Sequence, residues 1–160
     1  MARSLVLLLV LAGLLSGCGA HSPRVLDERY SSIHIAVFDN QTYEIALEEG
    51  FTRSMIEAFQ RDGRLRIEPA STADLEMEAV IDQAIVTPLT YTDLDRAVGF
   101  HIDVQVLVTV TDSAGNKILN ERPFRARGVY QLSNEPAQRN VLNVSDQLAE
   151  QVLSYLIEGW

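Results

Sequence analysis

The stretch Gly99–Asp112, with the sequence GFHIDVQVLVTVTD, decides the fold of this chain. Apolar side chains occupy every second position in it, namely Phe100, Ile102, Val104, Val106, Val108 and Val110. Because side chains alternate between the two faces of a strand, this spacing predicts one continuous apolar face. The opposite face is mostly polar, as in a sheet that is covered on one side only. The stretch is therefore expected to be an inner strand.

A second extended run, Lys117–Leu132, follows after the turn-rich cluster Asp112–Asn116. Two extended runs joined by a short segment that contains Gly predict a β-hairpin. Pro123 lies in the second run and has no N–H to donate to a ladder. This strand is therefore expected at an edge of the sheet, or bulged at that point.

The rest of the chain predicts two helices and further strands. Helical spacing of apolar residues indicates a helix over Glu44–Asp62 and a last helix from the Ser133–Pro136 start to about Glu158. Shorter alternating runs predict the strands Ile33–Phe38, Leu65–Ile67 and Leu75–Leu89, and 87–98 is expected as a loop. In these strands, one face should carry Ile33, Ile35 and Val37, and another Met77, Ala79, Ile81 and Ile85, with the register near Asp82 left open. The order predicts an α/β two-layer sandwich, a mixed sheet of about four strands with two helices packed on one face.

The first seventeen residues have the features of an export signal. A short positive start and an apolar run, Leu5–Leu15, precede Ser16-Gly17-Cys18. The run is too short to span a bilayer core of about 30 Å. Small residues before a single Cys resemble the lipobox of bacterial lipoproteins, which implies cleavage before Cys18 and acylation of that Cys. The alternatives are a buried free Cys or a plain secretory signal.

We therefore divide the chain into a removed signal peptide (1–17), an acylated Cys with a polar tether (18–32), and one domain (33–160). Gly19 follows the Cys, where Asp is the familiar retention signal, so outer-membrane sorting is expected. Removing 1–17 takes away Arg3 and leaves 12 basic against 22 acidic residues, a net charge of −10. Such a charge disfavours nucleic acid as a partner, because long-range repulsion opposes binding.

Catalysis has little support in the sequence. Its single Cys and three His show no metal-ligand spacing, and no Gly-rich phosphate loop is present. His101 and Asp103 would share a strand face, but no serine can be placed beside them from sequence. The prediction is a protein that is not an enzyme and needs no cofactor or metal.

Four segments in their order resemble one known family. These are Ile35–Glu44 with Leu47-Glu48 after it, Asp62–Arg66, Ala73–Ala79 and Leu156–Trp160. With the lipobox, they resemble the lipopolysaccharide-assembly lipoprotein family LptE over nearly the whole mature chain. The resemblance implies a lipid-anchored outer-membrane subunit that plugs a large β-barrel partner, LptD, binds lipopolysaccharide and catalyses no reaction.

Basic side chains in the second arm of the hairpin are the candidate contacts. Arg125 and Arg127 should share one face, and Arg122 should point to the other unless Pro123 lies in a bulge. Arginine forks bind phosphates in a bidentate way, so lipopolysaccharide phosphates or an acidic barrel wall are possible ligands. Salt bridges to Glu121 or across the sheet are the alternative explanation. Arg96, in the predicted loop, is a further candidate.

Of two other functions, that of a regulator stays open and that of a hydrolase does not. A lipid-anchored periplasmic regulator of a peptidoglycan synthase would favour a long disordered tether, and the tether here has about fourteen residues. A hydrolase would need a nucleophile and a base, which the sequence does not supply together.

Overall fold

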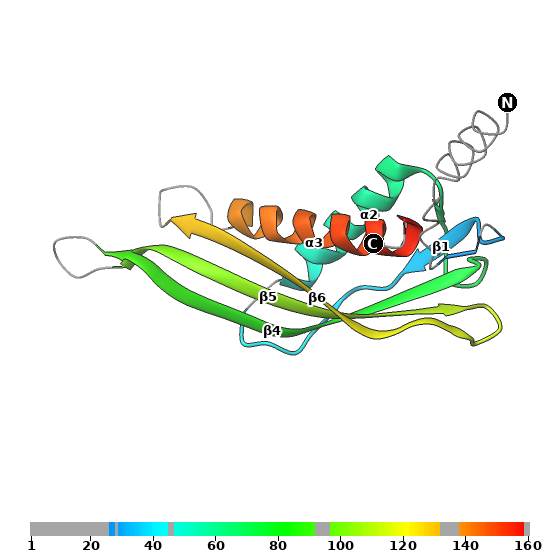
Figure 1. The fold of residues 1–160 in the computed structure, drawn as a ribbon, viewed down its shortest axis with the longest axis horizontal. Helices are drawn as coiled ribbons and strands as arrows, with labels where there is room; N and C mark the ends of the chain where they lie inside the picture. Colours follow the sequence, from blue (N-terminus) through cyan, green and yellow to red (C-terminus); the bar gives the residue numbers. More distant parts are fainter. Residues whose placement is uncertain (1–25, 28, 45–46, 92–96, 132–137, 159–160) are drawn as a thin grey trace, which may run out of the picture.

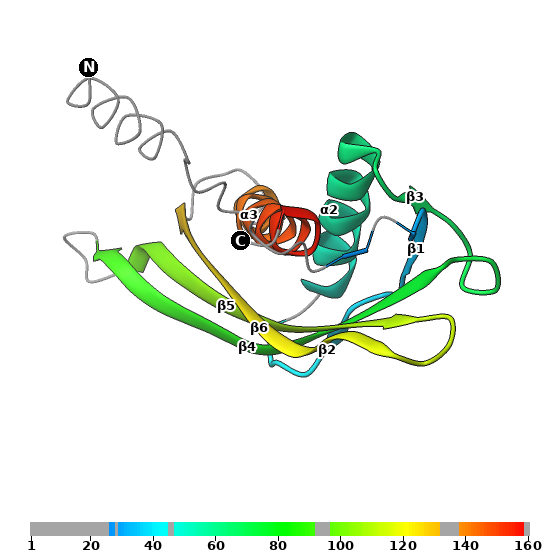
Figure 2. The ribbon, with the colours of Figure 1, turned by 45° about the vertical axis from the view of Figure 1, so that its right-hand side comes forward.

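The computed structural model describes residues 26–27, 29–44, 47–91, 97–131 and 138–158. Two helices pack on one face of a mixed sheet, which curves around them (Figures 1 and 2). The strand order is β3-β1-β4-β5-β6, and β2 also pairs with β4, so the sheet has six strands. The predicted two-layer α/β sandwich is confirmed, whereas the predicted number of about four strands is too low.

The elements have the following bounds. The strands are β1 Ser32–Ile35, β2 Asp39–Asn40, β3 Arg66–Ile67, β4 Leu75–Tyr91, β5 Ala97–Asp112 and β6 Lys117–Gln131. The helices are α2 Leu47–Asp62 and α3 Gln138–Glu158. The pairs β1–β3, β1–β4 and β2–β4 are parallel, and the pairs β4–β5 and β5–β6 are antiparallel.

Strand β5 is the inner strand that its alternation predicts. It lies between β4 and β6, and its side chains on the helix face are at most 3 % exposed from Ile102 to Val110. Val106, at its middle, faces Ile81 on β4 and Phe124 on β6, and all three are buried. Strand β6 lies at the edge of the sheet, as Pro123 indicates.

The predicted strand Ile33–Phe38 is shorter in the structure, because β1 ends at Ile35, and one extra residue separates its register from that of β2. Ile35 pairs with Met77 and Asp39 with Val80, so four steps along β1–β2 match three along β4. A one-residue slip moves side chains to the other face. Val37 was expected on the face of Ile33 and Ile35, but it is 73 % exposed, and Phe38 is buried in its place. Strand β2, which begins after the predicted end of this strand, is one of the additional strands.

A second extra residue lies in β4. The register shifts between Ile81 and Gln83, which makes Asp82 a β-bulge. Beyond the bulge, Ala84 faces the buried Val104 on the helix side, so Ile85 points to the opposite, outer face. The prediction that Ile85 shares a face with Ile81 is therefore wrong, and Ile85 is 48 % exposed.

The expected loop 87–98 is shorter than predicted. Strand β4 continues to Tyr91 and β5 begins at Ala97, so the two strands extend beyond the helices at one end (Figure 1). Pro88 pairs with Phe100 in this extension, next to a register shift. Proline in a strand is tolerated at such irregular positions, where no ladder hydrogen bond is lost.

A glycine ends α2, and a buried pair of hydroxyls joins the two helices. Gly63 ends α2 with a φ of 75°, a left-handed conformation that favours glycine, and its N–H donates to the Phe59 carbonyl at 3.0 Å. The hydroxyls of Ser54 on α2 and Ser145 on α3 are 2.8 Å apart and buried. Because both partners are small, the helices can approach closely without leaving these hydroxyls unpaired.

The start of β1 is attached to β4 through one carboxylate. Asp74 accepts hydrogen bonds from the backbone N–H groups of Ser31 (2.8 Å) and Ser32 (3.1 Å) and from both serine hydroxyls (3.0 Å each). These donors, the Ser31 N–H first, favour the charged form and hold the pKa of Asp74 below its usual range.

We expect Asp74→Asn to lower the melting temperature at neutral pH, because an amide has no charge and accepts fewer of these hydrogen bonds. A lowered folded-state pKa stabilises the fold above the unfolded pKa of about 3.9 and loses this effect as the pH falls through the folded value. The difference from wild type should therefore shrink below about pH 4, which thermal melts by circular dichroism can measure. Asp39→Asn, at the exposed first residue of β2, where Gln41 donates to the carboxylate, should melt like wild type. Equal melting of the Asp74 variant and wild type at pH 7 would contradict this assignment.

Candidate functional site

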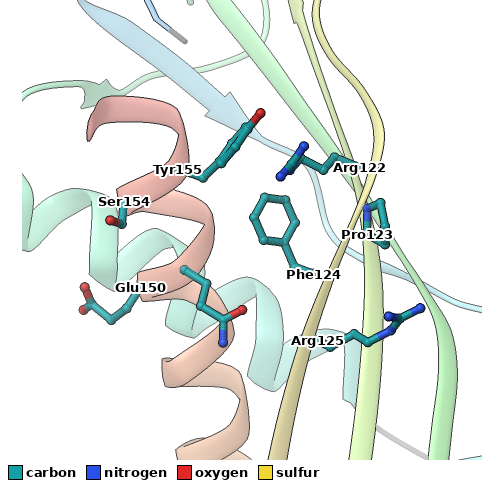
Figure 3. Close-up of a pocket in the computed structure, with 8 residues that line it drawn as sticks. Arg122, Pro123, Phe124, Arg125, Glu150, Ser154 and Tyr155 are labelled. Atoms are coloured by element: carbon teal, nitrogen blue, oxygen red, sulfur yellow. The ribbon is translucent and has the colours of Figure 1, made fainter. Parts of the chain in front are cut away.

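Strand β6 carries three arginines, and the pleat divides them between two faces. Arg125 and Arg127 lie opposite Gln105 and Asp103 of β5, on the outer face that points away from the helices. Arg122 lies on the helix face, in phase with Phe124 (Figure 3). The irregularity of β6 lies just before Arg122, where Glu121 has a φ of 43°, so Pro123 itself continues the regular alternation.

Cross-strand hydrogen bonds hold the two outer arginines. The Nε of Arg127 donates to Asp103 Oδ1 at 2.6 Å, and this contact raises the pKa of the arginine. The Nε of Arg125 donates to Gln105 Oε1 at 2.5 Å, and Gln105 donates in turn to Asp82 Oδ2 at 2.8 Å. Salt bridges are the alternative to ligand binding as an explanation of the arginines. Arg127 does form such a bridge across the sheet, and its partner is Asp103 rather than Glu121.

The same face retains the capacity to bind an anion. The side chain of Arg127 is 68 % exposed, and only its Nε donates to a described residue. A guanidinium has five N–H donors, so four stay available for another partner. Ile85 lies opposite Asp103 on this face, and Val129 lies opposite His101 and is 47 % exposed. Cations and exposed apolar side chains therefore occur together on the outer face.

Arg122 has different surroundings on the helix face. Its guanidinium lies over the ring of Tyr155 on α3, 3.9 Å from the centroid, and 6.0 Å from the ring of Phe124. The two rings meet edge to face at 5.8 Å, so the three side chains form one stack (Figure 3). Within the described part of the chain, no carboxylate forms an ion pair with Arg122.

This stack forms one end of a groove of about 630 Å³ between β6 and α3. The strand supplies Arg122–Arg125, and the helix supplies Glu150, Gln151, Ser154 and Tyr155. The side chain of Arg125 points away from α3, so it contributes mainly backbone (Figure 3). The carboxylate of Glu150 is paired with Arg61 on α2 at 2.7 Å. Arg122 is thus the cationic side chain that lines the groove and can contact a ligand there (Figure 3).

A second groove, of about 450 Å³, lies along the exposed side of α2. Val37 and Ile56 supply apolar lining, and Glu48, Glu49 and Glu57 supply acidic groups. The one-residue slip that turns Val37 outward also creates this surface.

His101 and Asp103 do share the outer face, but they do not form a catalytic arrangement. Asp103 is committed to Arg127, and the residues opposite His101 are Thr87 and Val129 rather than a serine. Across the described residues, no group of three His, Cys, Asp or Glu side chains could hold a metal. Nor does any described helix have the length and hydropathy that crossing a membrane would require.

Two of the predicted site residues, Cys18 and Arg96, lie outside the described residues. The structure adds two side chains that sequence reasoning did not connect to the arginines, Tyr155 and Gln151. Tyr155 was placed on the apolar face of the last helix by its spacing, but only the fold brings it against Arg122. A basic residue two positions before a buried aromatic in an edge strand is the signal that could have indicated the stack.

Comparison with known families gives one match. The model of the family described as LptE, Lipopolysaccharide-assembly, matches residues 30–156. This range includes every described strand and nearly all of α3. No curated protein sequence matches the chain.

Several solved structures have a similar fold at low sequence identity. The PelC dodecamer from Paraburkholderia phytofirmans has a TM-score of 0.57 and 16 % identity over 85 % of this chain and 94 % of that one. Lipoprotein B from Nitrosomonas europaea has a TM-score of 0.53 and 11 % identity over 81 % and 84 %. The hypothetical protein CT253 from Chlamydia trachomatis has a TM-score of 0.53 and 14 % identity over 79 % and 98 %. At these identities the likeness is one of fold.

We expect Arg122→Ala to lower the free energy of unfolding by about 0.5–1 kcal/mol, the usual range for an exposed cation–π contact. Arg125→Ala removes a guanidinium three residues away that stacks on no described ring and makes an exposed hydrogen bond to Gln105, so its effect should stay within about 0.5 kcal/mol. Urea unfolding followed by circular dichroism measures both. Equal effects of the two variants would show that the Tyr155 stack contributes nothing to stability.

Proposed function

The chain belongs to the LptE lipopolysaccharide-assembly family, and from this membership we propose that it plugs an LptD-type outer-membrane β-barrel and binds lipopolysaccharide. The single observation that carries the proposal is the family match over residues 30–156. The family is one of non-enzymatic lipoproteins, so the proposed role is assembly rather than catalysis. Acylated Cys18 would anchor the chain in the outer membrane, because several acyl chains hold a protein to a bilayer without a spanning helix.

The outer face of the sheet supports a role inside a barrel. Along its length it carries Glu76 and Glu78, then Gln83 and Gln105, and then Asp103 with Arg127. The lumen of an outer-membrane barrel is polar, so a plug can present a polar surface to it. The net charge of −9 for the whole chain favours a lumen wall of complementary positive charge.

The arginines of this face support lipopolysaccharide as the ligand. Lipopolysaccharide carries phosphates beside acyl chains. The exposed guanidinium of Arg127 and the exposed side chain of Ile85 lie in one cross-strand row, through Asp103. Arginine binds phosphate in a bidentate way through donors that the Asp103 pair leaves available. Charge and apolar surface thus occur together, as this ligand requires.

The first test is purification of the chain from detergent-solubilised outer membranes through a tag placed after Trp160. We expect one large β-barrel to co-purify in a one-to-one ratio, measured by quantitative mass spectrometry. Co-purification of an inner-membrane peptidoglycan synthase instead would favour the regulator. Recovery of the lipoprotein alone would contradict the proposed function.

The second test is the double change Arg125→Glu with Arg127→Glu. It should weaken lipopolysaccharide binding at least about tenfold, because two charge-assisted contacts become repulsive. The matched control is Arg53→Glu with Arg61→Glu, which makes the same change of charge on α2 in the helix layer. Binding to immobilised lipopolysaccharide and a circular dichroism spectrum of each variant provide the measurement. If both double variants bind equally well while folded, the outer face does not contact the ligand.

A further inference from the structure

The outer edge of β6 is an open sheet edge. Strand β6 ends the strand order, and among the described residues it pairs with β5 alone. Within a sheet, proline occurs where its missing N–H would face away from the neighbouring strand. The register runs without a shift from Arg122 to Gln131, so residues in phase with Pro123 have the same backbone orientation. The N–H and C=O groups of Arg125, Arg127 and Val129 therefore face outward.

The bulge and the proline that hinder strand addition lie only in the first half of this edge. A bulge, the positive φ of Glu121 and Pro123 interrupt it near its start. Bulges, prolines and charges are the usual means by which proteins protect sheet edges. From Arg125 to Val129 there is neither proline nor bulge. An added strand would find regular hydrogen-bonding groups there.

The groove between β6 and α3 lies beside the Arg122–Arg125 part of β6, next to the start of this edge (Figure 3). A strand edge with a helix across a groove is suited to an extended peptide, because the backbone pairs with the edge and alternate side chains enter the groove. The side chains that would enter meet Phe124, Tyr155 and Gln151. Its volume of about 630 Å³ accommodates several side chains.

Charge indicates which segment fits. Arg122 is at the groove, has no carboxylate partner among the described residues, and is held in place by its stack on Tyr155. A second copy of this chain is a poor occupant, because antiparallel pairing of two β6 edges would bring Arg125 and Arg127 against the same residues of the copy. Like charges opposite each other in a sheet are destabilising.

We propose that the Arg125–Val129 edge of β6 and the adjacent groove bind an extended acidic segment of another polypeptide, which adds as a further strand and places a carboxylate on Arg122. The inference stands on the edge, the groove and the arginine, and it does not depend on the identity of the barrel partner. It assigns Arg122 a partner different from that of the outer arginines.

The experiment places a photo-cross-linking p-benzoylphenylalanine at Gln151, on the helix wall of the groove, in the full-length lipoprotein in its native cells. A second cross-linker at Glu57, exposed on α2, is the control position. We expect a polypeptide adduct from position 151, with Asp or Glu in the cross-linked peptide identified by mass spectrometry. Arg122→Glu should lower the yield of this adduct at least about tenfold, since a charged hydrogen bond becomes a repulsion.

A matched pair of variants tests the edge itself. Val129→Pro removes one outward N–H without changing the bonds to β5, whereas Val129→Thr keeps the N–H and the preference for a strand. The adduct should fall with the proline variant and persist with the threonine variant. Circular dichroism tests whether both variants are folded. Should the proline variant not fold, Arg122→Glu decides alone.

The inference would be overturned if position 151 gave no polypeptide adduct or an adduct to a second copy. It would also be overturned by an adduct that neither Arg122→Glu nor Val129→Pro reduces. An adduct only to lipopolysaccharide would overturn it as well, while leaving the proposed function in place. An adduct to a polypeptide other than a barrel would support this inference without supporting the proposed function.

Discussion

The two-residue period of β5 is the constraint on which the rest of the structure depends. Its side chains from Ile102 to Val110 are buried alternately against the helices, so β5 cannot slip by one residue without exposing its whole apolar row. The long antiparallel pairings with β4 and β6 then inherit this register. On the outer face, the pairs of Gln105 with Arg125 and of Asp103 with Arg127 are placed by that alternation. The arrangement of candidate contacts is thus a consequence of core packing.

Other strands of the sheet fit this register through single extra residues. One at Asp82 turns Ala84 inward and Ile85 outward, and one between β1 and β2 turns Phe38 inward and Val37 outward. A bulge re-aims the side chains beyond it, so each changes the surface as well as the core. The exposed Ile85 joins the row of Arg127, and the exposed Val37 joins the groove along α2. The apolar surface outside the core therefore arises largely at positions where a strand is irregular.

Sequence reasoning could predict what depends on regular periodicity. The inner strand β5, the hairpin to β6 and both helices follow from spacing, and the common face of Arg125 and Arg127 follows from the same alternation. The missing N–H of Pro123 indicates an edge or a bulge. What it could not predict depends on where an extra residue is accommodated. Asp82 reads as one more polar residue in a strand, and only the register against β5, in which Gln83 pairs with Gln105 and Asp82 is passed over, shows that it is the bulge. The stack of Arg122 on Tyr155 was equally hidden, because it joins residues 33 positions apart whose contact depends on how α3 packs on β6.

The distribution of cations on β6 has a physical consequence for any partner. The chain is acidic as a whole, yet its edge strand carries Lys117, Arg122, Arg125 and Arg127. Charge of this sign at an open edge opposes pairing between two copies and favours acidic partners, so one set of residues both limits self-association and selects a ligand. The pleat then separates the selected ligands in space, because Arg125 and Arg127 reach the outer face while Arg122 reaches the groove beside α3. A single strand therefore presents its cations on two separate surfaces, so that a partner of one does not compete with a partner of the other.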